Sequence, residues 1–361
     1  LYVGSASAGG AMTSTSAPWR RRLRKIASIS CDGADPCSSD APAAAQPASG
    51  GPLDCWVSRS GAAGPKPARS RSRSRSPKRK GEAAEAVPRS PGRPGAAAAP
   101  GGPLVAHIAA SDFAQDILAQ LEDQGYAVLR GVLTASEAEA ALNRMWDFVE
   151  TVSPTVRRGD AETWYPKGKL DPWPHSARDM MQLHQAGWVF GELREALADR
   201  LFGPLYGTRE LHSSKDGFCF QRPTRAPVRR RPNDHFDQSG QKVGLHCIQA
   251  SVALLDQDPD DGCFVCWPAS HKHHASVAAS GNGKDWYVLS DAAKKTLEQA
   301  GCKPKRLPVG RGDVVLWRSD LAHCGGSPVG VRKGFRAVVY VCMLPAALTP
   351  QSLYPRKREA F

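Results

Sequence analysis

The sequence has no apolar run long enough to cross a membrane. A spanning helix needs about 20 mainly apolar residues, and every apolar stretch in these 361 residues is much shorter. The ten cysteines follow no compact repeating spacing, and a chain of this length does not need a disulfide framework. We therefore expect a soluble, intracellular protein with reduced cysteines.

Residues 1–104 also lack the large apolar side chains that a core requires. They consist mainly of Ala, Gly, Ser and Pro, and such a segment cannot bury enough surface to offset the entropy lost on ordering it. Residues 1–100 hold 16 Lys and Arg against 6 Asp and Glu, which accounts for most of the chain's net charge of +13. The composition predicts a disordered basic tail over residues 1–104, an ordered domain over residues 105–350 and a short basic tail over residues 351–361.

Two stretches of the N-terminal tail are typical of targeting signals. From Met12, "MTSTSAPWRRRLRKIASIS" is rich in Ser and Arg and has no acidic residue before Asp32, as in an organelle transit peptide. Residues 69–80, "RSRSRSRSPKRK", predict a nuclear import signal, a tract that binds RNA or protein, or a solvated linker. The compartment is therefore open between nucleus, cytoplasm and an organelle. Nucleic acid is expected to bind only through this tract, and the oligomeric state is unknown from the sequence.

Two helices and a strand are predicted where the ordered domain begins. One helical face is formed by Phe113, Ile117, Leu118 and Leu121. A strand follows at Tyr126–Leu129. The residues "TASE" from Thr134 form a capping-box pattern, and a second helical face then combines Ala138, Ala141, Leu142, Met145 and Phe148. Residues 151–190 are rich in Trp, Pro and His without periodicity, which predicts a long loop with a short helix that could cover a site.

From Gly217 onward the pattern becomes one of short strands. They are "GFCFQ", "GLHCIQASVALLD", "CFVCWP", "PKRLPV", "GDVVLW" and "FRAVVYVCML", separated by Gly, Pro and Asp clusters. Many short strands with few helices between them predict a mainly β protein, a jelly roll or barrel, with flanking α-helices. In the second of these strands the even positions are apolar and the odd positions include Gln249 and Ser251, so one face is expected to pack and the other to receive something polar.

Three residues have the order of a metal site. His235 and Asp237 lie two positions apart, so on an extended strand they project from the same side. His323 follows the apolar strand that ends at Trp317. Two histidines and one carboxylate on one face suit ferrous iron, because three positions of an octahedral ion stay open for a keto acid and oxygen. Arg336 could pair with the far carboxylate of such a keto acid, whereas Arg332, in a turn, is expected to be solvated.

A resemblance to the phytanoyl-CoA dioxygenase family of iron- and 2-oxoglutarate-dependent oxygenases spans roughly residues 110–348. It is carried by "LEDQGYAVLRGVL", "HFDQSGQKVGLHCIQASVALLDQDPDDGCFVCWPASHK", "GRGDVVLWRSDLAHCGG" and "GFRAVVYVCMLP". The resemblance implies a double-stranded β-helix with Fe(II) held by His235, Asp237 and His323. It also implies 2-oxoglutarate bound by Arg336, with Ser251 and Gln221 as further contacts.

The resemblance further implies the reaction. Oxygen and 2-oxoglutarate would be consumed to give succinate and carbon dioxide, and a C–H bond of a small molecule would be hydroxylated. Related halogenases have a small residue in place of the carboxylate ligand, so the presence of Asp237 favours hydroxylation. The substrate itself is not readable from the sequence.

Several other features admit alternatives. Five arginines precede the metal pair and could meet an anionic substrate or a nucleic acid backbone, or form a solvated loop: Arg222, Arg225, Arg229, Arg230 and Arg231. The histidines of "SHKHHA" are expected to form a solvated turn. Four tryptophans are assigned to the core: Trp188, Trp267, Trp286 and Trp317. The rival function is a nuclear RNA- or protein-interaction factor with an inactive jelly roll as scaffold, or an oxygenase acting on nucleic acid.

Overall fold

The computed structural model describes residues 102–168, 170–174, 180–181, 191–214, 217–227, 231–260, 262–352 and 354–355. The predicted disordered tail lies outside these residues except for its last three, and so do both targeting signals and most of residues 351–361. Leu104 is fully buried and its N–H donates to the Leu245 carbonyl. The ordered part therefore includes the last residues of the segment that the sequence assigned to the tail.

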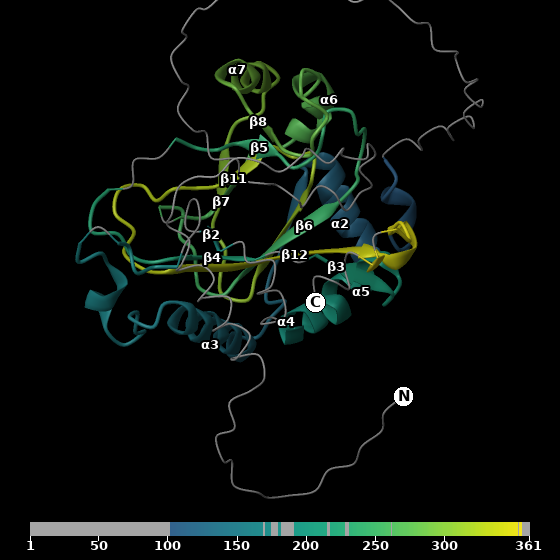
Figure 1. The fold of residues 1–361 in the computed structure, drawn as a ribbon. Helices are drawn as coiled ribbons and strands as arrows, with labels where there is room; N and C mark the ends of the chain where they lie inside the picture. The colour runs from purple at the N-terminus through teal and green to yellow at the C-terminus, as the bar shows by residue number, and fades with distance from the viewer. Residues whose placement is uncertain are drawn as a thin grey trace, which may run out of the picture.

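Two antiparallel sheets face each other and form a jelly roll, as the sequence predicted (Figure 1). The larger sheet has the order β1 (Tyr126–Leu129), β10 (Val314–Arg318), β6 (Ile248–Ala253), β12 (Arg336–Pro345), β4 (Phe218–Gln221) and β2 (Met180–Met181), with β3 (Leu211–Ser213) also paired with β12. The smaller sheet has the order β8 (Tyr287–Val288), β5 (His235–Phe236), β11 (His323–Gly325), β7 (Phe264–Cys266) and β9 (Lys305–Leu307). Successive strands from β4 to β12 mostly alternate between the sheets, which is the winding of a double-stranded β-helix.

Helices cover the outer faces of both sheets. Those packed on the larger sheet are α2 (Asp112–Asp123), α3 (Ala135–Val152), α4 (Gly191–Leu197), the π-helix η6 (Ala198–Phe202) and α5 (Gly203–Tyr206). Beside the smaller sheet lie α6 (His274–Val277) and α7 (Asp291–Gln299). Short 3-10 helices occur at η2 (Val105–His107), η3 (Ala161–Trp164), η7 (Ser270–His273) and η8 (Ala346–Leu348). No described helix is both long and apolar enough to span a bilayer.

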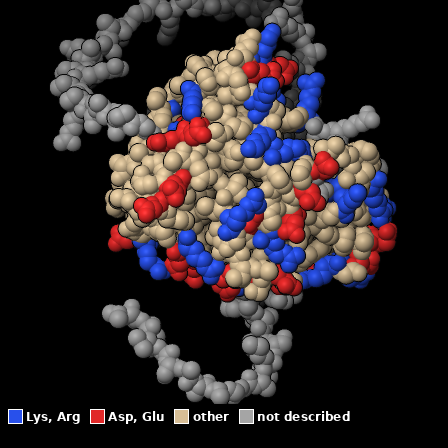
Figure 2. Space-filling view, turned by 180° about the vertical axis from the view of Figure 1, so that it is seen from behind, with Lys and Arg blue, Asp and Glu red and all other residues tan. Residues whose placement is uncertain are grey.

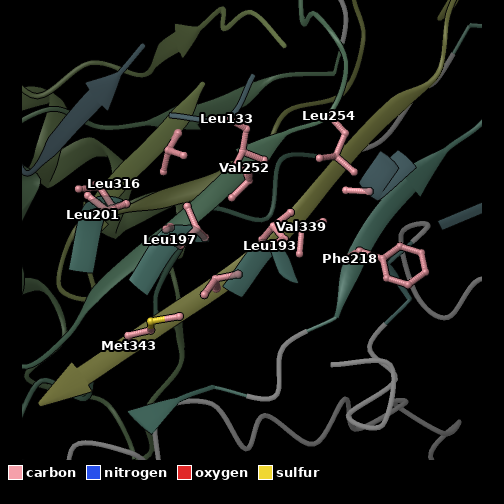
Figure 3. Close-up of a cluster of buried hydrophobic side chains, with 14 of the residues drawn as sticks. Leu133, Leu193, Leu197, Leu201, Phe218, Val252, Leu254, Leu316, Val339 and Met343 are labelled. Carbon is pink, nitrogen blue, oxygen red and sulfur yellow. The ribbon is translucent and has the colours of Figure 1, made fainter. Parts of the chain in front are cut away.

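The alternation along β6 divides the larger sheet into an apolar face and a polar face. Its even residues from Ile248 to Leu254 belong to the main core cluster, which also contains side chains of α4 and η6 (Figure 3). Gln249 and Ser251 face the smaller sheet and are also buried. The predicted alternation is confirmed, and the polar face points into the space between the sheets.

Three details of the fold differ from the sequence prediction. Phe113 is 39% exposed, because Ala114 takes its place in the buried face of α2. The histidines of "SHKHHA", expected in a solvated turn, lie in the helices η7 and α6. Residues 151–190, predicted to be a loop with a short helix, contribute β2 to the edge of the larger sheet, and their Trp164 and Trp173 pack against Trp146 of α3.

The connection into α3 is fixed by a capping box and a glycine. Thr134 accepts a hydrogen bond from the Glu137 N–H, and the Glu137 carboxylate accepts from the Thr134 N–H, as the sequence predicted. Just before the cap, the Leu133 N–H donates to the carbonyl of Gly312. Gly312 has φ +85°, and a Cβ there would lie 2.2 Å from the Leu133 carbonyl oxygen. Only glycine allows this close approach of β10 to the α3 connection.

Gly312→Ala is expected to destabilise the protein much more than Gly301→Ala. Both glycines have left-handed φ, but Gly301 has nothing within 4 Å of its Cβ position. Alanine costs about 1–2 kcal/mol at either site for the left-handed backbone. At Gly312 it must also displace the Leu133 carbonyl, which adds roughly 1–3 kcal/mol. Urea denaturation of both variants measures the difference, and equal losses would contradict the close approach.

Candidate active site

His235, Asp237 and His323 converge between the two sheets. His235 on β5 and His323 on β11 are direct partners across antiparallel strands, and their ring centroids are 4.5 Å apart. The Nε2 atoms of His235 and His323 lie 3.5 Å and 3.4 Å from the two carboxylate oxygens of Asp237. One donor atom from each residue lies within 4.8 Å of the others. The residues that the sequence placed together are together in the structure.

Hydrogen bonds orient all three side chains toward one point. Nδ1 of His235 lies 2.6 Å from the Asn233 carbonyl oxygen, and Nδ1 of His323 lies 2.9 Å from the Leu321 carbonyl oxygen. Each Nδ1–H therefore donates to the backbone, which leaves the Nε2 lone pair free to bind a metal. The Asp237 backbone N–H donates to the Ser319 carbonyl. The backbone that carries the carboxylate is therefore held both by β5, which precedes it, and by the residue that follows β10.

The site favours the protonation states that bind a metal. Burial opposes ionisation of Asp237, but the neighbouring His235 and His323 hold the pKa of this carboxyl below its ordinary value. Burial lowers the pKa of His235, which favours the neutral imidazole. An anionic carboxylate and neutral imidazoles are the forms in which these groups coordinate metals, so the set fits a divalent ion such as iron.

Arg336 provides a buried positive charge further along the same interior. It is 3% exposed, and its guanidinium donates to Gln257 Oε1 at 3.3 Å and to Cys219 Sγ at 3.2 Å. Tyr340 lies beside it, and burial raises the pKa of Tyr340 to about 12, so the phenol is neutral. No carboxylate of the described residues pairs with Arg336. A buried guanidinium without a carboxylate is costly, and this fits the binding of an acid such as 2-oxoglutarate.

The other two predicted contacts are cross-strand neighbours of Tyr340 and Arg336. Ser251 is the cross-strand partner of Tyr340, and it follows Gln249 on the polar face of β6. Gln221 is the cross-strand partner of Arg336, and its Oε1 is buried with no hydrogen-bond partner among the described residues. Ser251 therefore lies beside Tyr340 and Gln221 beside Arg336, and their contact with 2-oxoglutarate stays a prediction.

The structure corrects the prediction for Arg332 and shows the partners of two other arginines near the site. Arg332 is 4% exposed and not solvated, because its N–H donates to Thr224 and its guanidinium to the Arg222 carbonyl. Arg222 and Arg225 form ion pairs with Asp171 and Glu162, with donor–acceptor distances of 2.7 Å in each case. Their charges are compensated within the chain, while Arg229 and Arg230 lie outside the described residues.

Further corrections concern histidine and tryptophan. His274, expected in a solvated turn, is 2% exposed, and its Nε2 lies 2.9 Å from the Gln238 carbonyl oxygen. Trp267 and Trp317 are core residues as predicted, and Trp188 lies outside the described part of the chain. Trp286 is not core: it is 41% exposed, has φ 127°, and its ring lies 6.0 Å from that of His235.

Sequence reasoning missed the contact between Gln249 and Asp237. The amide Nε2 of Gln249 donates to Asp237 Oδ2 at 2.8 Å. The polar alternation of β6 identified Gln249 as facing something polar, but a single sequence does not reveal which of the facing residues it meets. Tyr340 was also missed, because an isolated aromatic residue in a strand is usually a packing residue, and Trp286 was assigned to the core for the same reason.

Comparison with known proteins gives the family. The model of the phytanoyl-CoA dioxygenase family matches residues 121–329, more than half of the chain. The protein belongs to the phytanoyl-CoA dioxygenase family. The description of this family is that of a dioxygenase, and the His-Asp-His group of this chain could hold a metal ion.

Individual relatives are more distant. Ava biosynthesis cluster protein O of Aspergillus versicolor is 25% identical over 171 residues, which cover 44% of this chain and 55% of that protein. The chain thus matches about half the length of this relative. AviO1 from Streptomyces viridochromogenes has a TM-score of 0.42 and 19% identity, over 67% of this chain and 99% of that one. EctD from S. alaskensis, crystallised with 2-oxoglutarate and 5-hydroxyectoine, has a TM-score of 0.46 and 16% identity, over 68% and 82%.

Proposed function

We propose that this protein hydroxylates a C–H bond of a small molecule, using Fe(II), 2-oxoglutarate and O2. The observation that carries the proposal is the convergence of His235, Asp237 and His323, together with the buried Arg336 on the inner face of the larger sheet. The three residues supply two nitrogens and one oxygen, which leaves half of an octahedral iron open. Asp237 occupies the position of the third ligand, and this favours transfer of hydroxyl over transfer of halide.

Each residue of the site has a distinct task. His235, Asp237 and His323 hold the metal, and the backbone hydrogen bonds of both histidines keep Nε2 turned toward it. Arg336 binds the far carboxylate of 2-oxoglutarate, and Ser251 and Gln221 contact the same molecule. Bound iron would activate O2, the oxidant, with two electrons from 2-oxoglutarate, which is converted to succinate and carbon dioxide. The protein's share is to orient the reactants and to exclude water.

The substrate is expected to enter beside His235. The exposed ring of Trp286 lies there, and its left-handed backbone is the kind of strained conformation that is often kept at functional sites. An aromatic face at the entrance suits a substrate with an apolar surface. An anionic substrate is still admitted by the sequence, but Arg222 and Arg225 do not support it, since their carboxylate partners already compensate them.

His235→Ala and Asp237→Ala are each expected to abolish tight metal binding. The wild-type protein should bind one cobalt(II) per chain, measured by titration under anaerobic conditions. Loss of a hydrogen-bond partner outside the metal shell costs about 10–100-fold in affinity, so loss of a ligand should cost more. His273→Ala is the control, because its ring is not among the grouped ligand atoms. Unchanged cobalt binding in Asp237→Ala would defeat the assignment.

Arg336→Gln is expected to raise the KM for 2-oxoglutarate by about 10–100-fold, followed by succinate release with ferrous iron and oxygen. A hydrogen bond to a charged group contributes about 1.5–3 kcal/mol, and glutamine removes the charge. Arg332 is also buried and lies in the turn just before β12. Arg332→Gln should change this KM little. The opposite order of effects would show that Arg332 holds the carboxylate.

The product distinguishes hydroxylation from related oxidations. Mass spectrometry of candidate substrates incubated with 2-oxoglutarate should show a product that gains one oxygen atom. A product of unchanged mass would indicate inversion of a stereocentre, and loss of two hydrogens would indicate ring closure or desaturation. Either result would keep the oxygenase assignment and reject hydroxylation.

The second candidate is a nuclear interaction factor whose Arg-Ser tract binds RNA or protein. A deletion separates the two functions, and it should end at residue 101, because Leu104 is buried in the ordered domain. If the protein is an enzyme, the shortened chain keeps its succinate release and its thermal stability. Loss of RNA binding in a chain that never shows turnover, even with a broad set of substrates, would favour the interaction factor.

A further inference from the structure

Gln249 connects the larger sheet to the metal-binding carboxylate. It lies on β6, is fully buried, and pairs with Trp317 of β10 on one side and Cys342 of β12 on the other. Its Nε2 donates to Asp237 Oδ2 at 2.8 Å. Its Oε1 is buried without a hydrogen-bond partner among the described residues. Among the described residues, the one hydrogen bond of this amide is therefore to the Asp237 carboxylate.

Folding stability alone does not explain this glutamine. An unpaired buried carbonyl oxygen costs about as much as a hydrogen bond to a charged group returns. Methionine has nearly the same length and volume and would leave no polar atom unpaired. The hydrogen bond to Asp237 is what distinguishes glutamine from methionine at this position, so the reason for Gln249 is to be sought at Asp237.

The two oxygens of Asp237 have different surroundings. Each oxygen lies near one imidazole, Oδ1 at 3.5 Å from His235 Nε2 and Oδ2 at 3.4 Å from His323 Nε2. Only Oδ2 also accepts the Gln249 hydrogen bond, whereas Oδ1 accepts no hydrogen bond from the described residues. The Asp237 backbone is already fixed by its N–H to the Ser319 carbonyl. Rotation of the carboxylate is the freedom that is left, and Gln249 restrains it.

We propose that Gln249 is a positioning residue that makes Asp237 a metal ligand through Oδ1 alone. The inference rests on the proposed function, because it assumes that the metal binds at His235, Asp237 and His323. A carboxylate that binds through one oxygen leaves three positions of an octahedral ion open. If Oδ2 also turned to the metal, one of the positions that the keto acid and oxygen need would be filled. Gln249 thus keeps the coordination sphere open.

Gln249→Met tests the proposal with cobalt(II) as the probe. Cobalt affinity should fall by about 10–100-fold, the range for the loss of a hydrogen-bond partner of a metal ligand. The visible absorption spectrum of the bound cobalt should change, because a second carboxylate oxygen enters its coordination sphere. The affinity of the cobalt-loaded protein for 2-oxoglutarate should fall as well. The thermal midpoint of the metal-free protein should stay near that of the wild type, since the lost hydrogen bond and the relieved carbonyl oxygen oppose each other.

Gln120→Met is the matched control. Gln120 is exposed on α2, and its amide donates to the Asp116 carbonyl. The same chemical change there should leave the cobalt spectrum, the cobalt affinity and the affinity for 2-oxoglutarate as in the wild type.

An unchanged cobalt spectrum and affinity in Gln249→Met would overturn the proposal. So would a large drop in the thermal midpoint with an unchanged spectrum, because that is the result of a purely structural amide. If Gln249→Met does not fold, Gln249→Asn, whose amide is one carbon too short to reach Asp237 in the same way, is read by the same criteria. Failure of the wild-type protein to bind cobalt would instead overturn the proposed function itself.

Discussion

The direct pairing of β5 with β11 is the constraint on which the site depends. His235 and His323 come from distant parts of the chain, yet they are opposite each other across one antiparallel pair. Opposite residues in such a pair have Cβ atoms about 4.5–5.5 Å apart on the same face, so the pairing alone brings the two imidazoles together. Asp237 follows β5 and is bonded through its N–H to the end of β10. The ligands therefore also join the two sheets to each other.

The two faces of the larger sheet have different roles, packing on one side and binding on the other. Its outer face is apolar and packs under the helices, and its inner face carries Gln249, Ser251, Tyr340 and Arg336. Buried polar groups are tolerated when they satisfy each other or a ligand. Several of the polar groups in this interior have an oxygen or nitrogen without a hydrogen-bond partner among the described residues, including Gln221 and Gln249. The helices supply the stability, and the inner face keeps hydrogen-bonding capacity for what binds there.

The sequence predicted the features whose cause is local. The capping box at Thr134, the alternation of β6 and the spacing of His235 and Asp237 are visible within a few residues. It did not predict β5 and β11, which are only two and three residues long and exist because long-range pairing holds them. It also misjudged Arg332, whose burial depends on Thr224 and Arg222 more than a hundred positions earlier. Ser290, the N-cap of α7, is also a local signal in the sequence, and it follows a Gly-rich turn.

The net positive charge and the candidate active site lie in different parts of the sequence. Most of the net positive charge lies in residues 1–100, while Lys and Arg are mixed with Asp and Glu over the face of the ordered part in Figure 2. Two of the arginines that precede the site, Arg222 and Arg225, are paired with carboxylates, which compensate their charges. Arg336, in contrast, is buried and lacks a described carboxylate partner. A buried charge of this kind can select an acidic cosubstrate. The mixed positive and negative charges of the outer surface do not interfere with this selection.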